Sequence, residues 1–369
     1  MRVLMTGGGT AGHINPALAI ASTIKQNNPS AEIEFVGTPK GLEDRLVGEA
    51  GYKIHHVNIM GVRRSLSPQN IKAAFLMISS QFQARRIIKK FKPDIVIGTG
   101  GYVCWPALRV ASKMGIPAVA HESNARPGLA IRQLQGNLDK ILVNFKDSEK
   151  YIKNKEKVVH VGNPLRGGFG TLDRDSARRQ LGIPEDKVYV LAFGGSLGAQ
   201  RINEIVFSYM KNVARDSESI LCELCTGRDY YEEFSKYFRD AGLDKCSNLS
   251  MVEYINDMHV RMSAADVVIC RAGAMTISEI AMMKKASLII PSPNVVDNHQ
   301  FKNAKVLADA DAAVLIEEKV LDDTVFANEM QALIEDADKR ERLSKNIVQF
   351  ANLEANKIIY EEILKLINK

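Results

Sequence analysis

Glycine-rich loops that follow apolar runs are the features of this sequence best suited to chemistry. The first loop, Gly7-Gly8-Gly9-Thr10-Ala11-Gly12-His13, comes directly after the apolar run at residues 2–6. The second, Gly194-Gly195-Ser196-Leu197-Gly198-Ala199, follows a comparable run at residues 188–193. In such loops backbone N–H groups can approach an anion, and the N-terminus of a following helix favours negative charge. Both loops are therefore expected to contact a phosphate or a sugar.

The first loop matches the dinucleotide-binding spacing G-x-G-x-x-G at Gly7, Gly9 and Gly12. A site for NAD would also need an acidic residue at the end of the second strand, where it would bind the ribose hydroxyls. That strand is expected to end at Phe35-Val36-Gly37-Thr38, which contains no acid. The NAD interpretation therefore lacks its second feature. A tight packing turn is the remaining alternative to phosphate or sugar binding.

A third candidate segment follows the apolar run at residues 267–270 and opens a helix. It reads Arg271-Ala272-Gly273-Ala274-Met275-Thr276-Ile277-Ser278-Glu279. Thr276 and Ser278 offer hydroxyl donors at the helix start, and Glu279 could accept hydrogen bonds from ribose hydroxyls. Ordinary helix capping with an early glutamate is the alternative. Beside two phosphate-type loops, ligand binding is the better interpretation.

The acids and thiols of the sequence do not form a recognisable metal site. Three D-x-D pairs, at 173–175, 309–311 and 336–338, do not follow expected strands and are interpreted as solvated acids. Cys222 and Cys225 form a C-x-x-C within a strand-like run, where positions three apart face opposite sides. We interpret them as reduced core residues and expect neither a metal ion nor an organic cofactor.

Apolar strands that alternate with amphipathic helices must position these loops. Strands are expected near 2–6, 31–36, 54–58, 94–97, 117–120, 139–143, 158–161, 188–193, 220–225, 249–252, 267–270, 287–291 and 312–316, and helical periodicity fills 323–367. This alternation predicts an α/β fold of parallel sheets covered on both faces, in two Rossmann-like domains. The predicted domains are residues 1–163 and 164–345, with a last helix at 346–369 that could pack back on the first domain.

Charge is distributed unevenly along the chain. Residues 1–160 carry a net charge of +12 and the remainder −6, and residues 50–93 contain no acid. This basic stretch includes Phe75, Ile78 and Phe82 at helix-like spacing, followed by Arg85 and Arg86. An exposed apolar face with a cationic rim predicts binding to an anionic membrane surface. A nucleic-acid patch is the alternative, but no recognised nucleic-acid-binding motif accompanies it, so no such partner is expected.

The motifs together resemble the MurG family, the bacterial peptidoglycan N-acetylglucosaminyltransferases. The resemblance covers nearly the whole chain and rests on Gly8-Gly9-Thr10-Ala11-Gly12-His13 with Asn15-Pro16, Gly98-Thr99-Gly100-Gly101-Tyr102, His121-Glu122-Ser123-Asn124, Gly162-Asn163-Pro164-Leu165-Arg166, Gly194-Gly195-Ser196, Ala274–Glu279 and Asp297-Asn298-His299-Gln300. It implies the GT-B fold, in which two Rossmann-like domains face each other across a cleft. One departure is Ala11, which stands where the family usually has glycine; its methyl narrows the loop without removing a donor.

The resemblance also implies a reaction. N-Acetylglucosamine would pass from UDP-N-acetylglucosamine to the muramyl 4-hydroxyl of undecaprenyl-pyrophosphoryl-MurNAc-pentapeptide (lipid I), with inversion, giving lipid II for peptidoglycan synthesis. Another nucleotide-sugar enzyme of the same fold, such as a glycolipid glycosyltransferase or a UDP-sugar epimerase, is the alternative. No segment approaches the roughly 20 apolar residues of a membrane span. The start, Met1-Arg2-Val3, leaves no room for a signal peptide. The chain is therefore expected as a peripheral protein at the cytoplasmic face of the cell membrane.

Carried over to this sequence, the resemblance implies specific binding residues. Arg166 and Ser196 would contact the diphosphate, and Ile255 would place the uracil against backbone groups. The residues along the phosphates and ribose would be Ala274, Met275, Thr276, Ile277, Ser278 and Glu279, with Gln300 on the sugar hydroxyls. The residues that would reach the sugar end from the first domain are Thr10, Ala11, Gly12 and Asn124.

The general base has two candidates. His13 lies at the junction of the first loop and its helix, and histidine titrates near neutral pH. A capping or loop-ordering histidine is the alternative interpretation of that residue. Glu122 is the rival base.

Overall fold

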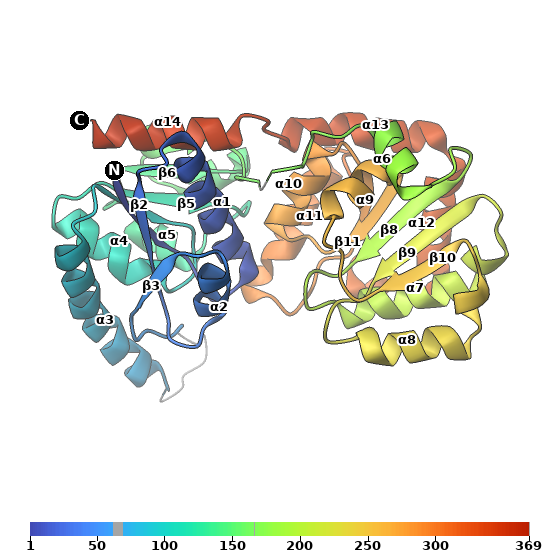
Figure 1. Ribbon diagram of the computed structural model, residues 1–369, viewed down its shortest axis with the longest axis horizontal. Coiled ribbons are helices and arrows are strands. Elements are labelled where there is room, and N and C mark those ends of the chain that lie inside the picture. Colours follow the sequence, from blue (N-terminus) through green and yellow to red (C-terminus); the bar gives the residue numbers. More distant parts are fainter. Residues whose placement is uncertain (62–68, 166, 369) are drawn as a thin grey trace. The chain divides into compact units, whose positions relative to one another are not determined.

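The computed structural model of this chain describes residues 1–61, 69–165 and 167–368. The chain divides into two compact units (Figure 1). Unit 1 comprises Met1–Leu165 with Asn352–Lys369, and unit 2 comprises Arg166–Ala351.

Unit 1 is built on a parallel sheet that, in the described part of the chain, has the strand order β3-β2-β1-β4-β5-β6-β7. Its strands are β1 (Arg2–Thr6), β2 (Glu32–Gly37), β3 (Lys53–His56), β4 (Ile95–Gly98), β5 (Ala118–Glu122), β6 (Lys140–Val143) and β7 (Val158–His160). The central strands are short apolar runs, such as residues 95–97, that are fully buried because helices cover both faces of the sheet.

The helices of unit 1 pack into two apolar clusters, one on each face of the sheet. One cluster contains side chains from α1 (Ala11–Asn27), α2 (Leu42–Glu49) and α14 (Ala355–Ile367). The other contains side chains from α3 (Gln69–Phe91), α4 (Cys104–Lys113) and α5 (Leu129–Leu134). Alternate residues of each strand supply the two clusters, as the period of two in a β-strand requires.

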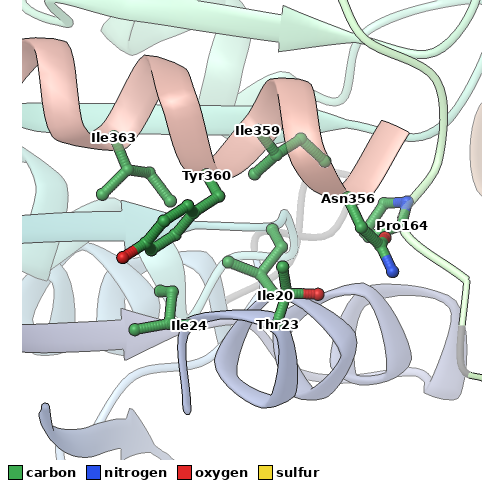
Figure 2. A pocket seen from close by; sticks show the side chains of 8 residues that line it. All are labelled: Ile20, Thr23, Ile24, Pro164, Asn356, Ile359, Tyr360 and Ile363. Carbon is green, nitrogen blue, oxygen red and sulfur yellow. The ribbon is translucent and has the colours of Figure 1, made fainter. Parts of the chain in front are cut away.

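The C-terminal helix α14 belongs to unit 1, although it follows the whole of unit 2 in sequence. Figure 2 shows Ile359, Tyr360 and Ile363 of α14 beside Ile20 and Ile24 of α1. Ile359 and Ile363 are fully buried in this contact. The apolar side chains of α14 thus complete one face of the first sheet.

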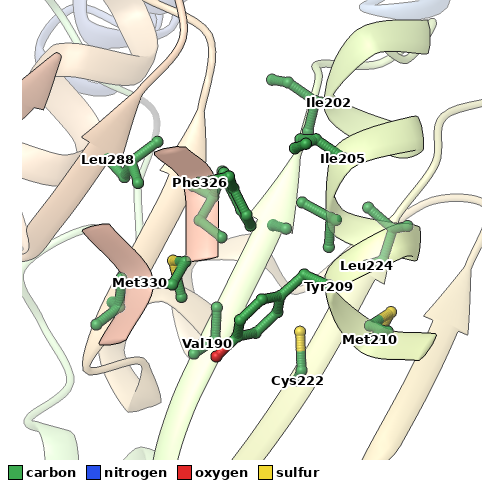
Figure 3. Packing of buried hydrophobic residues seen from close by; sticks show 14 of the residues in the cluster. Val190, Ile202, Ile205, Tyr209, Met210, Cys222, Leu224, Leu288, Phe326 and Met330 are labelled. Carbon is green, nitrogen blue, oxygen red and sulfur yellow. The ribbon is translucent and has the colours of Figure 1, made fainter. Parts of the chain in front are cut away.

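Unit 2 repeats the same architecture with a parallel sheet in the order β10-β9-β8-β11-β12-β13. Its strands are β8 (Val188–Phe193), β9 (Ile220–Cys225), β10 (Leu249–Val252), β11 (Val267–Cys270), β12 (Ala286–Ile289) and β13 (Val314–Leu315). Its helices are α6 (Arg174–Leu181), α7 (Gln200–Asn212), α8 (Tyr231–Asp240), α9 (Met258–Ala264), α10 (Ala274–Met282), α11 (His299–Asp309), α12 (Asp323–Glu335) and α13 (Ala337–Ile347). Figure 3 shows the core between α7, α12 and the sheet, where the rings of Tyr209 and Phe326 meet edge to face at 5.6 Å.

The prediction of an α/β fold with parallel sheets in two Rossmann-like halves is confirmed. Each sheet has a point where the strand order reverses, between β1 and β4 in unit 1 and between β8 and β11 in unit 2. In open α/β sheets, ligands bind outside the carboxyl ends of the strands at such a switch point. The loops that follow these four strands are therefore the places to look for chemistry.

Candidate active site

The loops after β1 and β4 are joined by hydrogen bonds at the switch point of unit 1. The Gly8 amide donates to the Gly100 carbonyl at 3.4 Å, and the Thr99 amide donates to the Thr6 carbonyl at 2.9 Å. The Thr99 hydroxyl donates to the backbone carbonyl of His13 at 2.6 Å. Thr99 is buried and holds the first turn of α1 against the end of β4. The two loops therefore form one structural element that carries His13.

The His13 side chain lies between these two loops. Its Nδ1 is 3.1 Å from the Gly8 carbonyl oxygen and 3.3 Å from the Thr10 hydroxyl. A carbonyl only accepts, so a hydrogen bond to Gly8 requires the proton on Nδ1, and in a neutral ring of that tautomer Nε2 is the basic nitrogen. A Cβ atom at Gly100 would lie 2.7 Å from the ring's Cδ2, and one at Gly101 would lie 3.2 Å from Nδ1. Glycine at both positions allows the ring to lie directly against the backbone.

The residues Thr10, Ala11 and Gly12 form the N-terminus of α1. In the described structure, Thr10 has the extended conformation of an N-cap but makes no capping hydrogen bond with its side chain, and the first turn of α1 contains no acid. Thr10 and Gly12 are exposed, and Ala11 is partly exposed. The first backbone N–H groups of a helix have no partners within the helix, so they can donate hydrogen bonds to a ligand at this end.

Glu122 ends β5 and is buried. One carboxylate oxygen accepts from the amide and the side-chain Nδ2 of Asn124 at 2.9 and 3.1 Å, and the other accepts from the Gly128 amide at 2.7 Å. Burial raises the pKa of Glu122, and these hydrogen bonds oppose the rise only in part. The preceding His121 is buried, bonded through Nε2 to the Gly162 carbonyl at 2.9 Å, and burial lowers its pKa to about 4. Glu122 thus holds the loop that carries Asn124, whereas His121 bonds to the segment just after β7.

In unit 2, the loop after β8 is packed onto the loop after β9. A Cβ atom at Gly198 would lie 2.0 Å from the Thr226 carbonyl, so only glycine allows this approach. Asn203 of α7 is buried and donates to the same carbonyl at 2.9 Å. The Ser196 carbonyl accepts from the Arg228 amide at 3.4 Å, while Ser196 as a residue is exposed. The loop is thus held by its backbone and presents Ser196 to solvent.

The helix α10 begins at the other side of this switch point. Its N-cap is Gly273, which has no side chain to cap the helix, and its first turn contains no acid. Ile277 is fully buried in the core, and the buried Ser278 hydroxyl donates to the Ala274 carbonyl at 3.2 Å. Within the predicted binding segment, the side chains that are partly exposed are Met275, Thr276 and Glu279.

The other predicted binding residues follow β10 and β12 of the same sheet. Ile255 lies just beyond β10 and is buried. Gln300 is in the first turn of α11, and its side-chain oxygen accepts from the Ser292 amide at 2.9 Å. Asp297 and Asn298, just before α11, both have positive φ angles, of 62° and 50°. Such values are uncommon for residues other than glycine, although Asp and Asn adopt them more readily than most. Arg166 lies outside the described residues.

The predicted membrane patch lies on α3, which packs against α4 with its opposite face (Figure 1). Ile71, Phe75, Ile78 and Phe82 are 77%, 70%, 59% and 72% exposed. Their spacing of four, three and four residues places them in one stripe along the helix. The stripe leads into exposed basic side chains at Arg85, Arg86 and Lys89. No helix in the described ranges is long and apolar enough to span a bilayer.

The described residues include no group of three or more His, Cys, Asp or Glu side chains placed to hold a metal ion. Asp173 and Asp336 cap the N-termini of α6 and α13, and Asp311 pairs with Arg342. Cys222 and Cys225 are buried and free. One acid of each D-x-D pair thus caps a helix or forms a surface ion pair.

Two residues that organise the first loop were not identified from the sequence. The glycine spacing points to neither Thr99 nor Glu43, yet Glu43 accepts hydrogen bonds from Gly9 and Thr38. Glu43 lies five residues beyond Thr38, the expected end of the second strand. An acidic residue early in the helix that follows this strand is the signal in the sequence that points to it.

Comparison with known proteins gives matches over both units. Residues 3–143 match the family model described as the glycosyltransferase family 28 N-terminal domain, and residues 189–359 match the family 28 C-terminal domain. A protein of Acetivibrio thermocellus is 43% identical over 98% of this chain and 97% of its own length. A protein of Christiangramia forsetii is 40% identical over 100% of this chain and 98% of its own length. Both are named UDP-N-acetylglucosamine–N-acetylmuramyl-(pentapeptide) pyrophosphoryl-undecaprenol N-acetylglucosamine transferase.

Solved structures give the same fold. The crystal structure of Acinetobacter baumannii MurG superposes with a TM-score of 0.78 at 29% identity, covering 99% of both chains. The structure of S. aureus MnaA with UDP superposes with a TM-score of 0.70 at 16% identity, over 100% of this chain and 98% of that one. At that identity the second likeness concerns the fold alone.

Proposed function

We infer, from the premise that this chain belongs to glycosyltransferase family 28, that it transfers N-acetylglucosamine from UDP-N-acetylglucosamine to the muramyl 4-hydroxyl of lipid I. The product is lipid II, and the reaction serves peptidoglycan synthesis. The observation that carries this proposal is the similarity to relatives named for this transfer over nearly the full length of both chains. That similarity covers the loops at both switch points.

The proposed reaction is a direct displacement at the anomeric carbon. The bond from the acceptor oxygen to the anomeric carbon forms while the bond from that carbon to the β-phosphate oxygen breaks, and UDP leaves with the electron pair. The configuration is inverted because attack and departure occur on opposite faces. A general base must take the acceptor's proton, and N–H groups or cations must stabilise the leaving diphosphate.

His13 is the proposed base. Its Nδ1 donates to the Gly8 carbonyl, which directs the ring so that Nε2 can accept a proton from the acceptor hydroxyl. Glu122 is the weaker candidate, because both of its carboxylate oxygens already accept hydrogen bonds from the 124–128 loop. We therefore propose that Glu122 positions Asn124, which contacts the sugar together with Thr10, Ala11 and Gly12.

The donor is proposed to bind at the switch point of unit 2. Ser196 and the N-termini of α7 and α10 would receive the diphosphate, since neither helix has an acid in its first turn. Arg166 would add a positive charge, Glu279 would accept from the ribose hydroxyls, and Ile255 would place the uracil. Gln300 would bind the sugar hydroxyls. From the rest of the segment, Ala274, Ile277 and Ser278 would contribute backbone groups, and Met275 and Thr276 side chains.

The acceptor is lipid-linked, so the enzyme must reach a membrane surface. The stripe Ile71, Phe75, Ile78 and Phe82 with its basic neighbours is the proposed site of contact with an anionic membrane, at the cytoplasmic face. Each well-placed basic side chain contributes about 1 kcal/mol near such a surface. Exposed Phe and Ile side chains add burial energy on insertion into the interface.

Turnover of a lipid I analogue with radiolabelled UDP-N-acetylglucosamine tests the proposal. We expect a lipid-linked disaccharide, identified by mass and by the β-linkage, and free UDP in equal amount. Turnover in excess EDTA tests the prediction from the sequence that no metal ion takes part. Incubation of the enzyme with UDP-N-acetylglucosamine alone is the control for a UDP-sugar epimerase. Epimerised donor without transfer to lipid I would overturn the proposal.

A further inference from the structure

Glu43 is a buried carboxylate that belongs to no binding set proposed above. It lies in the first turn of α2, is 1% exposed, and turns its side chain toward the loop after β1. Its Oε1 accepts from the amide and the hydroxyl of Thr38 at 3.0 and 2.5 Å. Its Oε2 accepts from the Gly9 amide at 3.1 Å. Burial opposes ionisation, but the hydrogen bonds from Thr38 and Gly9 outweigh it and lower the pKa of Glu43.

The carboxylate fills the space beside the glycine loop. A Cβ atom at Gly8 would lie 2.7 to 2.9 Å from the carboxylate atoms of Glu43, and one at Gly41 would lie 2.6 Å from Oε1. The loop has the form of an anion-binding loop, and on this side the anion that it binds is the carboxylate of Glu43. A glutamate in the first turn of a helix can interact favourably with the helix dipole while it remains exposed to solvent. The dipole therefore does not explain why the ionised side chain of Glu43 is buried.

One peptide group connects Glu43 to His13. The Gly9 N–H that donates to Glu43 and the Gly8 C=O that accepts from His13 Nδ1 belong to the same planar peptide unit. A charge-assisted hydrogen bond to the N–H polarises this unit, which makes its carbonyl oxygen a stronger acceptor. The same bond fixes the plane, so the carbonyl cannot rotate away from the imidazole. Both effects favour the ring with its proton on Nδ1.

We propose that Glu43 is a positioning residue for the transfer reaction: through the Gly8–Gly9 peptide it holds the His13 ring in the orientation and tautomer that leave Nε2 free of its proton. The inference rests on the proposed function for its catalytic consequence. Its structural part, the tautomer of His13, does not depend on which acceptor the enzyme uses. Glu43 is buried and bonds to Gly9 and Thr38 rather than to His13 itself, so its role is positioning and not catalytic.

Glu43→Gln is the decisive substitution, because it keeps the size of the side chain and removes the negative charge, so that in either orientation the charge-assisted hydrogen bond to the Gly9 N–H is lost. Whichever way the amide is turned, its NH2 group faces a backbone N–H, either that of Gly9 or that of Thr38. Asp44→Asn is the matched control, because it removes a carboxylate at the next position of α2. The Asp44 carboxylate lies at the surface, where Oδ1 is 2.7 Å from Nε2 of His56.

Two readouts separate positioning from general stability. In nitrogen-15 NMR of labelled histidines, with His13→Gln used for assignment, the wild-type His13 signal should report a proton on Nδ1. In Glu43→Gln it should report a mixture of tautomers, and in Asp44→Asn it should match the wild type. In turnover assays, Glu43→Gln should lower kcat about 10- to 100-fold, by analogy with the loss of outer hydrogen-bond partners of metal-bound histidines, with the KM for UDP-N-acetylglucosamine unchanged.

The outcomes distinguish the two proposals. A wild-type His13 with its proton on Nε2 would overturn the positioning role, even if Glu43→Gln failed to fold. An unchanged tautomer and kcat in a folded Glu43→Gln variant would do the same. The expected tautomer change without any transfer to lipid I in the wild type would retain the positioning role and reject the proposed function.

Discussion

Gly100 offers the sharpest test of the geometry around His13. The residue has a φ of +110°, and a Cβ atom there would lie 2.7 Å from Cδ2 and 3.1 Å from Nε2 of the imidazole. In Gly100→Ala the ring must move until Cδ2 reaches ordinary contact at about 3.4 Å, a shift of roughly 0.7 Å. A misplacement of about 1 Å at a reacting group can cost about 100-fold in rate, so we expect kcat to fall roughly 10- to 100-fold.

Backbone strain must be separated from this contact, because alanine at positive φ costs about 1–3 kcal/mol wherever it occurs. Gly115→Ala is the matched control. Gly115 follows α4 with a φ of +72°, and among the described residues nothing lies within 4 Å of a Cβ atom built there. Both variants should lose stability in urea unfolding, whereas only Gly100→Ala should lose turnover. Equal kcat in the two variants would show that the contact between His13 and the loop after β4 does not matter for the reaction.

Three further predictions concern the general base, the membrane contact and a buried lysine. His13→Ala should lower kcat at least about 100-fold, as expected for loss of a general base, whereas Glu122→Gln should mainly lower stability; near-full kcat in His13→Ala would reject the base assignment. Phe75→Asp combined with Phe82→Asp should weaken flotation with anionic liposomes by at least about 10-fold, because each partly inserted ring contributes about 1–2 kcal/mol, and unchanged flotation would show that α3 is not the anchor. Lys285 is buried, and burial lowers its pKa to about 8 from 10.5, so the unfolded chain binds more protons between these values and stability should rise with pH there. The free energy of unfolding of the wild type should gain about 3 kcal/mol relative to Lys285→Met from pH 8 to 10.5, and a difference that does not change with pH would contradict this.

The parallel sheets could be predicted because buried parallel strands are short, continuous apolar runs. Residues 2–6 and 267–270 were expected as strands and are β1 and β11 with those bounds. The last strand shows the limit: 312–316 was expected, but only Val314–Leu315 pairs with β12. Edge strands are defined by their hydrogen bonds, which an apolar run does not determine.

Within the predicted donor segment, periodicity carries information that the motif alone does not. Ala274, Ile277 and Ser278 are spaced by three and four residues, the spacing of one helix face, and all three are buried. Thr276 and Glu279 lie on a different face and are partly exposed. The motif alone does not distinguish the residues that pack in the core from those that can contact a ligand. The helical period does, because it assigns each residue to a buried or an exposed face of α10.

The contacts of Glu43 and Thr99 could not be predicted in the same way. Glu43 reaches Gly9 across 34 residues, and Thr99 reaches His13 across 86. The crossover connections between parallel strands bring these distant residues together, so their contacts depend on the order of the strands in the sheet. Sequence patterns identify the loops at the switch point. The tertiary fold determines which side chains pack against each loop.

The side chains that pack against the two glycine loops differ, and this difference would lead the loops to bind different ligands. In unit 1, the space beside Gly8 is occupied by the ionised carboxylate of Glu43, which accepts the Gly9 amide. In unit 2, a Cβ atom built at Gly195 meets nothing within 4 Å among the described residues, and α7 begins without an acid in its first turn. On the proposed function, an external diphosphate is expected to be repelled at the first loop, where Glu43 already accepts from the Gly9 amide, and to bind at the second. We therefore propose that the loop of unit 1 serves an uncharged sugar hydroxyl and its base, and that the loop of unit 2 serves the leaving diphosphate.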